Sequence, residues 1–290
     1  MCYTVDMDFS RYKISDKYYG GSERKIGIVI DGIEYMLKFQ KVTAFGIRYN
    51  HISEHLGSRI FGMAGIPAQE TFLGTYKGEP VVACRNFIDD GEHFVPFNDV
   101  GESSLDQDKE RYQYTYSDIM RMLSENSKLT EIEETIDIFW KMFVVDALLG
   151  NFDRHGGNWG FLKKENRYRL APIFDNGSCL FPNMTEEDEM TRVMNSPDET
   201  NKRVYGFPTS QIKLDGDKSS YYEVINSLSF PECNKALAEV FDRIDMAEIT
   251  ELIARTEGIS EIHKEFYRYM LTERYNKILK ASFDLLRSTK

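Results

Sequence analysis

Hydrophobic and polar positions divide the chain into a strand-rich beginning and a helix-rich remainder. Residues 26–40 contain two alternating β-type runs joined by an Asp-Gly pair, which is typical of a tight hairpin. Residues 50–64 carry apolar side chains at helical spacing, and two more strand-like runs cover residues 71–76 and 80–87. The order strand, strand, helix, strand, strand predicts a small α+β lobe.

The remainder of the chain alternates polar segments with apolar, helical ones. Residues 89–128 are rich in Asp, Glu, Ser and Gln and predict a connector with one short helix, whereas residues 131–149 predict a long buried helix that ends at Gly150. Residues 181–220 are polar and interrupted by Gly and Pro, so we expect a long loop over a site there. Residues 221–288 predict further helices.

The composition indicates a globular, acidic protein. The chain has 290 residues, of which 41% are hydrophobic, a formal net charge of −11 and a pI near 5.1. An acidic surface repels a nucleic-acid backbone and an anionic membrane, so we expect neither direct nucleic-acid binding nor membrane binding. Any phosphate site must then be a local pocket of cations or backbone amides.

Cysteine usage and the chain ends favour a cytoplasmic protein. The four cysteines are too dispersed to form a CxxC pair, which fits reduced thiols; they are Cys2, Cys84, Cys179 and Cys233. The N-terminal residues lack the apolar core of a signal peptide, and no run approaches the roughly 18 apolar residues that span a bilayer.

Candidate chemistry concentrates in residues 151–160, with the sequence NFDRHGGNWG, and residues 171–177, with the sequence APIFDNG. Phosphoryl transfer needs a carboxylate to accept the hydroxyl proton, and an amide oxygen and a second carboxylate to hold magnesium. The order and spacing of Asp153, Asn158 and Asp175 match those needs. Each could also have an ordinary role, as a helix cap or turn residue, but their joint occurrence favours a kinase active site.

Two upstream features support this hypothesis. Lys38 lies among strand apolars, where an ammonium needs an anion, and Glu54 on the next helix or a phosphate could supply it. The alternative for Lys38 is a solvent-facing position on an alternating strand. Gly20, Gly21 and Ser22 could let the backbone approach a phosphate, or could equally form a solvated turn.

Taken together, these motifs resemble the HipA-like serine/threonine kinases, and most closely the short CtkA-type members that lack a separate N-terminal domain. The resemblance covers roughly residues 15–290 and rests on the following segments: the glycine loop at 20–22, YMLK at 35–38, Ser53-Glu54 opening a helix that ends in GIP at 65–67, DALLGNFDRH at 146–155 with Asn158, and APIFD at 171–175.

The resemblance implies an α+β, two-lobed protein-kinase-like fold that binds ATP and Mg²⁺ between its lobes. We expect a β-rich N-lobe over residues 1–88 with one main helix, and a mainly helical C-lobe over residues 89–290. The implied function is ATP-dependent transfer of a phosphoryl group to Ser or Thr of a protein substrate. Related proteins are often toxins restrained by an antitoxin, which would be a further partner.

The resemblance also implies a role for each candidate residue. Asp153 would be the catalytic base, and Asn158 and Asp175 the magnesium ligands. Lys38 and Glu54 would seat the ATP phosphates. A hinge for adenine would lie around Arg85, Asn86 and Phe87, and His155 would orient the loop or the phosphates. Ser22 would be the candidate for autophosphorylation, although the glycine loop departs from a strict G-x-G-x-x-G pattern.

Two alternatives belong to other classes. His51, Glu54 and His55 satisfy H-x-x-E-H, a zinc-protease signature in which two histidines share one helix face. Surface histidines on an amphipathic helix are the commoner explanation of that pattern. A pseudokinase that binds nucleotide without transferring phosphate is the second alternative, and the joint presence of Lys38, Asp153, Asn158 and Asp175 argues against it.

Overall fold

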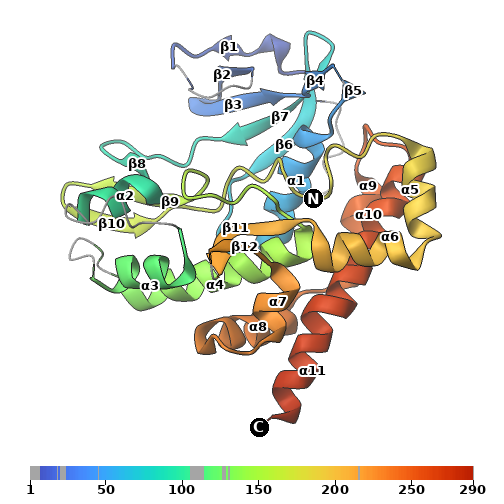
Figure 1. Cartoon of the computed structure of the whole chain (residues 1–290). Coiled ribbons are helices and arrows are strands. Elements are labelled where there is room, and N and C mark those ends of the chain that lie inside the picture. Colours follow the sequence, from blue (N-terminus) through green and yellow to red (C-terminus); the bar gives the residue numbers. More distant parts are fainter. Residues whose placement is uncertain are drawn as a thin grey trace.

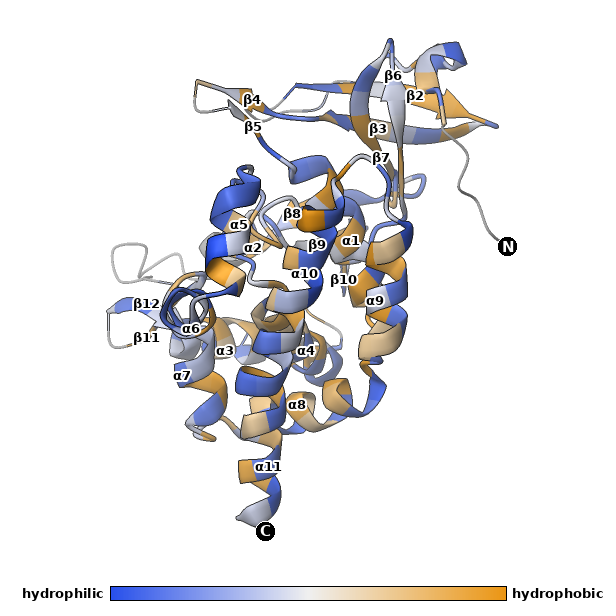
Figure 2. Ribbon diagram, turned by 90° about the vertical axis from the view of Figure 1, so that its right-hand side faces the viewer, coloured by the Kyte–Doolittle hydropathy of each residue, from blue (hydrophilic) through white to orange (hydrophobic). Residues whose placement is uncertain are grey.

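The computed structural model describes residues 7–17, 19, 24–44, 46–104, 114–125, 129, 131–214 and 216–289. The order of its elements confirms the predicted α+β fold: an N-terminal antiparallel sheet stands above a larger, mostly helical part (Figure 1). Figure 2 shows the sheet across the top of the molecule and the helices below it.

The N-terminal sheet contains five antiparallel strands in the order β1-β2-β3-β7-β6. Their bounds are β1 Lys13–Ile14, β2 Lys25–Ile30, β3 Ile33–Phe39, β6 Thr71–Tyr76 and β7 Glu79–Arg85. The predicted hairpin is confirmed, since Asp31 and Gly32 join β2 to β3 with φ angles of 49° and 80°. Left-handed backbone at both turn residues matches the right-handed twist of the flanking strands.

The molecule has two apolar cores. The smaller one lies against the N-terminal sheet and is built from Phe9, Ile28, Leu37, Phe39 and neighbouring side chains, with Phe9 in a 3₁₀ turn, η1 Phe9–Arg11. The larger core fills the helical part.

Helix α1, Asn50–Met63, confirms the predicted helix, and Gly65 follows it with a φ of 73°. Although α1 lies in the chain between β3 and β6 of the N-terminal sheet, its buried Ile52, Leu56 and Ile60 belong to the larger core. The helix therefore connects the sheet to the body of the protein. A short hairpin precedes it, formed by β4 Val42–Thr43 and β5 Gly46–Ile47.

Helix α4, Ile132–Leu149, is the centre of the larger core. It ends at Gly150, whose φ of 66° and ψ of 44° place it in the left-handed cap conformation, as predicted. The C-terminal helices also agree with the sequence pattern: α7 Tyr221–Asn226, α8 Pro231–Arg243, α9 Met246–Arg255, α10 Glu261–Arg274, the π-helical segment η3 Tyr275–Lys280 and α11 Ala281–Ser288.

The polar segment at 89–128 is more structured than predicted. It contains a strand and two helices: β8 His93–Pro96, α2 Phe97–Ser104 and α3 Tyr116–Glu125. The strand was missed because it is short and exists through pairing with a distant partner. It forms a three-stranded sheet in the order β10-β9-β8 with β9 Gly160–Lys164 and β10 Arg167–Leu170.

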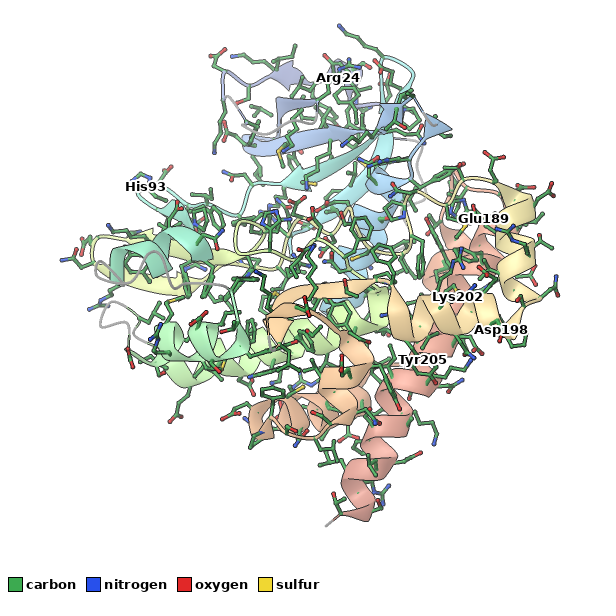
Figure 3. The ribbon with its side chains drawn as sticks, in the orientation of Figure 1. Arg24, His93, Glu189, Asp198, Lys202 and Tyr205 are labelled. Carbon is green, nitrogen blue, oxygen red and sulfur yellow. The ribbon has the colours of Figure 1, made fainter. Side chains whose placement is uncertain are left out.

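The prediction of a long loop at residues 181–220 is wrong. That segment holds α5 Glu187–Met194, α6 Pro197–Asn201, the π-helical segment η2 Lys202–Gly206, β11 Thr209–Leu214 and β12 Asp217–Ser220. Its polar side chains bind one another at the surface, as in the pairs Lys202–Glu199 at 2.7 Å and Arg203–Glu189 at 3.1 Å. Figure 3 shows Glu189, Asp198 and Lys202 on the outside of α5, α6 and η2. Polarity here indicated surface helices, not a loop.

Candidate functional site

A cleft of about 620 Å³ brings the predicted site residues together. Its lining includes Lys38, Glu54, Asp153, Asn158 and Asp175, which come from β3, α1 and the segments that follow α4 and β10. These residues are far apart in sequence, so their convergence results from the tertiary fold. These five residues bring one ammonium, three carboxylates and an amide into the cleft, the set that the sequence predicted for phosphoryl transfer.

Lys38 is paired with two carboxylates. Its Nζ lies 2.9 Å from Oε2 of Glu54 and 2.9 Å from Oδ1 of Asp175, and its side chain is 5% exposed. We call Lys38, Glu54 and Asp175 the cleft triad. Burial opposes the charge on Lys38, but Asp175 and Glu54 outweigh that effect and hold its pKa well above the ordinary lysine value. Lys38 is therefore a fixed cation, and the solvent-facing alternative is wrong.

The two carboxylates of the triad differ in exposure. Glu54 is 1% exposed, whereas Asp175 is 39% exposed and faces the cleft. The Lys38 ammonium beside Asp175 is the main cause that lowers the pKa of that carboxyl to about 2. Oε1 of Glu54 has no hydrogen-bond partner within the described part of the chain. Glu54 is thus the buried partner of Lys38, and Asp175 is the partly exposed partner that a ligand could replace.

No regular strand leads into Asp175. Ile173 forms an isolated bridge with Ala68, and the chain then turns, with Asp175 at a φ of 58°. Left-handed backbone is uncommon for a residue other than glycine and occurs where the surroundings impose it.

Asp153 and Asn158 lie on the loop after α4. Asn158 donates from Nδ2 to the backbone oxygen of Asp153 at 2.8 Å, which leaves its Oδ1 as the oxygen that can face a cation. Partial burial raises the pKa of Asp153, with Asp175 adding to the rise and His155 opposing it. A raised pKa brings a carboxylate closer to the range in which it can exchange protons near neutral pH.

A second ion cluster lies behind this loop. Arg154 donates from Nε to Oδ2 of Asp146 at 2.9 Å and from Nη2 to Oδ1 of Asn176 at 2.5 Å. Its Nη1 donates to the backbone oxygens of Asn158, at 3.0 Å, and Phe174, at 2.6 Å. We call Asp146, Arg154 and Asn176 the loop anchor. One guanidinium thereby joins the end of α4, the Asp153 loop and the Asp175 loop.

Close packing at two glycines holds the same parts together. A Cβ on Gly57 of α1 would lie 2.7 Å from Cβ of Asn176, and one on Gly156 would lie 2.0 Å from Oδ1 of Asn98 in α2. Any larger residue would push the Asp175 loop off α1 or the Asp153 loop off α2. These glycines were a signal of close approach that the sequence analysis did not use.

The expected hinge follows β7. The N–H of Arg85 donates to the backbone oxygen of Glu70 at 2.9 Å, and the side chain of Arg85 forms an exposed ion pair with Glu70, also at 2.9 Å. The N–H of Asn86 donates to the backbone oxygen of Glu34 at 2.9 Å. These groups are already occupied within the protein.

Phe87 is the next residue of the expected hinge. Its ring centre lies 5.5 Å from that of Phe174, which lines the cleft next to Asp175. The predicted glycine loop, with Gly20, Gly21 and Ser22, lies outside the described residues. His155 lines the cleft and is exposed, and its Nδ1 accepts from the N–H of Gly157 at 3.0 Å.

The geometry speaks against the zinc-protease alternative. Glu54 is bound to Lys38, and Nδ1 of His55 contacts Thr71 Oγ1 at 3.0 Å. His51 is buried and His55 is partly buried, so neither is a surface histidine, and this burial lowers the pKa of both to about 4. Among the described residues no group of three or more His, Cys, Asp or Glu side chains could hold a metal ion.

Sequence reasoning missed several residues of the site. Asp146 and Asn176 of the loop anchor were not singled out, although a carboxylate within the apolar helix 131–149 was a signal of a buried partner. The further cations that line the cleft, Lys25, Lys41 and Arg48, were not singled out either.

Within the described residues, no helix is long and apolar enough to cross a membrane.

Comparisons with known proteins agree with this geometry. A family model described as HipA-like C-terminal domain matches residues 18–256. The chain is 37% identical over 283 residues to the serine/threonine-protein kinase CtkA of Helicobacter pylori, covering 95% of this chain and 86% of that protein.

Solved structures were also compared. The crystal structure of the proinflammatory kinase CtkA of Helicobacter pylori superposes with a TM-score of 0.92 at 35% identity, covering 99% of both chains. A chain in the complex of HipA, HipB and operator DNA of Shewanella oneidensis has a TM-score of 0.52 at 14% identity, covering 92% of this chain and 67% of that chain. The second likeness concerns the fold alone.

Proposed function

Since the chain belongs to the HipA-like family and is a homologue of a serine/threonine-protein kinase, we propose that it transfers the γ-phosphoryl group of ATP to Ser or Thr hydroxyls of a protein, with Mg²⁺. The observation that carries this proposal is the cleft triad, which holds a buried lysine between two carboxylates in the same cleft as Asp153 and Asn158. A pseudokinase would not require a proton acceptor in the same cleft as that lysine.

The proposed reaction uses Asp153 as the proton acceptor. The substrate hydroxyl oxygen attacks the γ-phosphorus, the bond from that phosphorus to the β–γ bridging oxygen breaks, and ADP leaves with the electron pair. The hydroxyl proton passes to the Asp153 carboxylate, whose raised pKa suits it to that role. The N–H of Asp153 donates to Oδ1 of Asn151 at 3.0 Å, which helps to fix the loop that carries the base.

The donor atoms fit a magnesium ion. Oδ1 of Asn158 and the carboxylate of Asp175 are hard oxygen ligands in the same cleft, and we propose that they hold the ion. When bound, Mg²⁺ supplies positive charge to the phosphate oxygens. Lys38 then retains Glu54 as its buried partner and is available to a phosphate in place of Asp175.

We propose that adenine binds at the hinge. Because the N–H groups of Arg85 and Asn86 already have partners, the nucleotide would use the backbone from Phe87 onward, with Phe87 and Phe174 beside the base. The side chain of Arg85 points to Glu70 at the surface and takes no part in this proposal.

Ser22 remains the proposed site of autophosphorylation, and Gly20 and Gly21 the proposed contacts of the ATP phosphates, on the sequence pattern alone. A phosphate on Ser22 would add a charge of about −1.5 to −2 where the ATP phosphates bind, and would switch the enzyme off. Mass spectrometry after incubation with ATP tests this: phosphate on other residues and none on Ser22 would refute it. We also propose an antitoxin partner and a toxin role, on the family resemblance alone.

The central experiment compares wild type with Asp153→Ala during incubation with labelled ATP, magnesium and a protein substrate mixture. We expect labelling of the substrate by wild type and a loss of about 10²- to 10⁴-fold in the variant, as for removal of a general base. Nucleotide binding, measured by calorimetry, should be kept in Asp153→Ala. Equal labelling by the two proteins would remove Asp153 from the mechanism, and ATP binding without any transfer by wild type would indicate a pseudokinase.

A further inference from the structure

The catalytic cleft contains more positive charge than the proposed ATP site uses. Lys25, Lys38, Lys41 and Arg48 all line it, in a chain whose formal charge is −11. Lys25 is the register partner of Lys38 across β2 and β3, so both belong to the proposed phosphate region. In contrast, Arg24 beside Lys25 lies on the outside of the sheet over the ring of Phe39, at 3.9 Å (Figure 3). Lys41 and Arg48 remain without a role.

Strand β3 shows where Lys41 lies relative to the nucleotide. Tyr35 is paired with Arg85 at the hinge end of the strand, and Lys38 comes three residues later. Lys41 follows three residues after Lys38, in the same direction along the chain. At about 3.3 Å per extended residue, the step within β3 is about 10 Å. Beyond β3, the N–H of Gln40 donates to the backbone oxygen of Pro80 at 3.1 Å, so the chain continues along β7 in the same direction. A nucleotide that runs from the hinge to Lys38 therefore leaves Lys41 beyond its γ-phosphate, on the side from which the acceptor must approach.

Backbone hydrogen bonds hold Lys41 and Arg48 next to each other. The N–H of Arg48 donates to the backbone oxygen of Lys41 at 2.8 Å, which closes the β4–β5 hairpin. The N–H of Lys41 donates to Oδ1 of Asn50 at 2.9 Å, and Nδ2 of Asn50 donates to the backbone oxygen of Phe39 at 3.2 Å. The backbone that carries the two cations is thus bonded to the start of α1.

The backbone just before α1 is also hydrogen-bonded to the opposite wall of the cleft. The N–H of Tyr49 donates to the backbone oxygen of Pro182 at 2.9 Å, and Pro182 and Asn183 line the cleft with Arg48. The β4–β5 hairpin accordingly lies above α5, which follows this segment, in both Figure 1 and Figure 2. Lys41 and Arg48 therefore stand at one end of a continuous cleft and not on a separate surface.

The start of α1 adds to the positive potential at this end. Its first turn has no acidic side chain, and its N-cap residue Tyr49 makes no side-chain capping hydrogen bond. The N-terminus of a helix carries a partial positive charge, which these features leave uncompensated by the helix's own side chains. This reinforces the field of Lys41 and Arg48, which lie on the chain just before the helix.

We propose that Lys41 and Arg48 form a subsite for an anionic side chain of the protein substrate, close in sequence to the acceptor Ser or Thr. The proposal rests on the proposed kinase function and names its substrate class. The anion is the carboxylate of Asp or Glu or the phosphate of a phosphorylated residue, because both accept hydrogen bonds from guanidinium and ammonium groups. The subsite raises the local concentration of acidic segments at a protein that is itself acidic and would otherwise repel them.

The test uses peptides with one central serine and an otherwise neutral sequence. A single Asp, phosphoserine, Lys or Ala is placed at each neighbouring position in turn, and kcat/KM is measured at saturating ATP. We expect Asp or phosphoserine at one or more positions to exceed Ala on the order of tenfold, as a charge-assisted hydrogen bond contributes, and Lys to fall below Ala. Comparison of the Asp and phosphoserine arms identifies the source of the anion.

Lys41→Glu with Arg48→Glu should reverse the order, so that Lys at the preferred position exceeds Asp. The matched control is Lys164→Glu with Arg167→Glu, an exposed pair that faces across the β9–β10 hairpin and lies outside the cleft lining. It changes the net charge equally and should keep the wild-type preference. The KM for ATP is followed in parallel, because a large rise in it for the Lys41 and Arg48 variant would assign these cations to the nucleotide and overturn the proposal.

Binding separates this proposal from the kinase proposal. Anisotropy of labelled peptides that carry Ala in place of the acceptor serine, with a non-hydrolysable ATP analogue present, reports the subsite without catalysis. Tighter binding of the anionic peptides by wild type, lost in the Lys41 and Arg48 variant and kept in the control, supports the subsite even when no transfer is observed. Equal binding of anionic and neutral peptides by wild type overturns the subsite, whether or not the protein is a kinase.

Discussion

Two ion clusters lie within one region of this protein and differ in how completely they are satisfied. In the loop anchor, Arg154 is 4% exposed and Asp146 is 1% exposed, and the guanidinium donates to a carboxylate, an amide and two backbone oxygens. In the cleft triad, Asp175 is 39% exposed, and one oxygen of Glu54 has no hydrogen-bond partner among the residues that the structure describes. The first cluster is closed by the protein itself, whereas the second can exchange a partner for a ligand.

The difference indicates what each cluster does. A buried charge network that is fully paired within the protein fixes geometry, and the loop anchor fixes the loops of Asp153 and Asp175 against α4. In the cleft triad, Lys38 is paired with the buried Glu54 and the partly exposed Asp175. It can exchange Asp175 for a ligand at a small cost in free energy. The two clusters should therefore respond differently to substitution.

The largest expected effect is on stability, at the loop anchor. Arg154→Met leaves the Asp146 carboxylate buried without its cation and removes donors from two backbone oxygens. We expect a loss of about 3–5 kcal/mol in the free energy of unfolding, measured by chemical denaturation. Phosphoryl transfer should fall with it, since both catalytic loops lose their support. A loss below about 1 kcal/mol would show that the anchor is not structural.

The next effect separates the triad from the anchor. Asp175→Asn keeps the shape of the side chain and leaves Lys38 paired with Glu54. We expect kcat/KM to fall about 10²- to 10³-fold, the usual result of removing one electrostatic contact to the reacting groups. The free energy of unfolding should change by no more than about 1 kcal/mol, because this side chain is partly exposed. Equal destabilisation by Asp175→Asn and Arg154→Met would contradict the comparison.

The pH dependence should distinguish Asp153 from Asp175. Because the pKa of Asp153 is raised and its charged form is the base, kcat/KM should fall about tenfold per pH unit below that pKa, and the fall should begin above the ordinary aspartate value of 3.8. The pKa of Asp175 is lowered to about 2, so its stabilising contribution is complete above 3.8 and is lost as the pH falls toward 2.

Activity should consequently disappear at a pH where the fold persists. Circular dichroism measured over the same range as kcat/KM provides the check. An acid limb of activity that coincides with unfolding would mean that the limb does not report Asp153.

The smallest effect should come from the hinge. Arg85 and Glu70 form an exposed ion pair, and such pairs contribute about 0–1 kcal/mol. Arg85→Ala should leave both the melting temperature and the KM for ATP nearly unchanged, since the proposed adenine contacts use backbone beyond this residue. A tenfold rise in the KM for ATP would assign the side chain of Arg85 to the nucleotide.

Local features were well predicted where the physics that forms them is local. The Asp31-Gly32 turn, the apolar spacing of α1 and α4 and the cap at Gly150 each depend on neighbouring residues, and the structure agrees with all of them. The spacing of Asp153 and Asn158 was readable for the same reason, as the residues share one loop.

Features that depend on distant partners were missed. Strand β8 exists through its pairing with β9. The polar segment 181–220 folds because Met190, Val193 and Val204 pack into the larger core, while its charged side chains pair across α5, α6 and η2. The partners of Arg154 could not be assigned, because the carboxylate of Asp146 and the amide of Asn176 reach it from other segments of the chain.

The sequence by itself determined the β2–β3 hairpin, the helices α1 and α4, the family and the identity of the candidate catalytic groups, since these follow from periodicity, turn chemistry and motif spacing. Only the tertiary structure decided that Glu54 and Asp175 share one ammonium, that Arg154 is a buried anchor, and that Lys41 and Arg48 line the same cleft as the candidate catalytic groups. The physical reason is that charges interact through space, and the distance between them is set by packing of remote segments rather than by their separation along the chain.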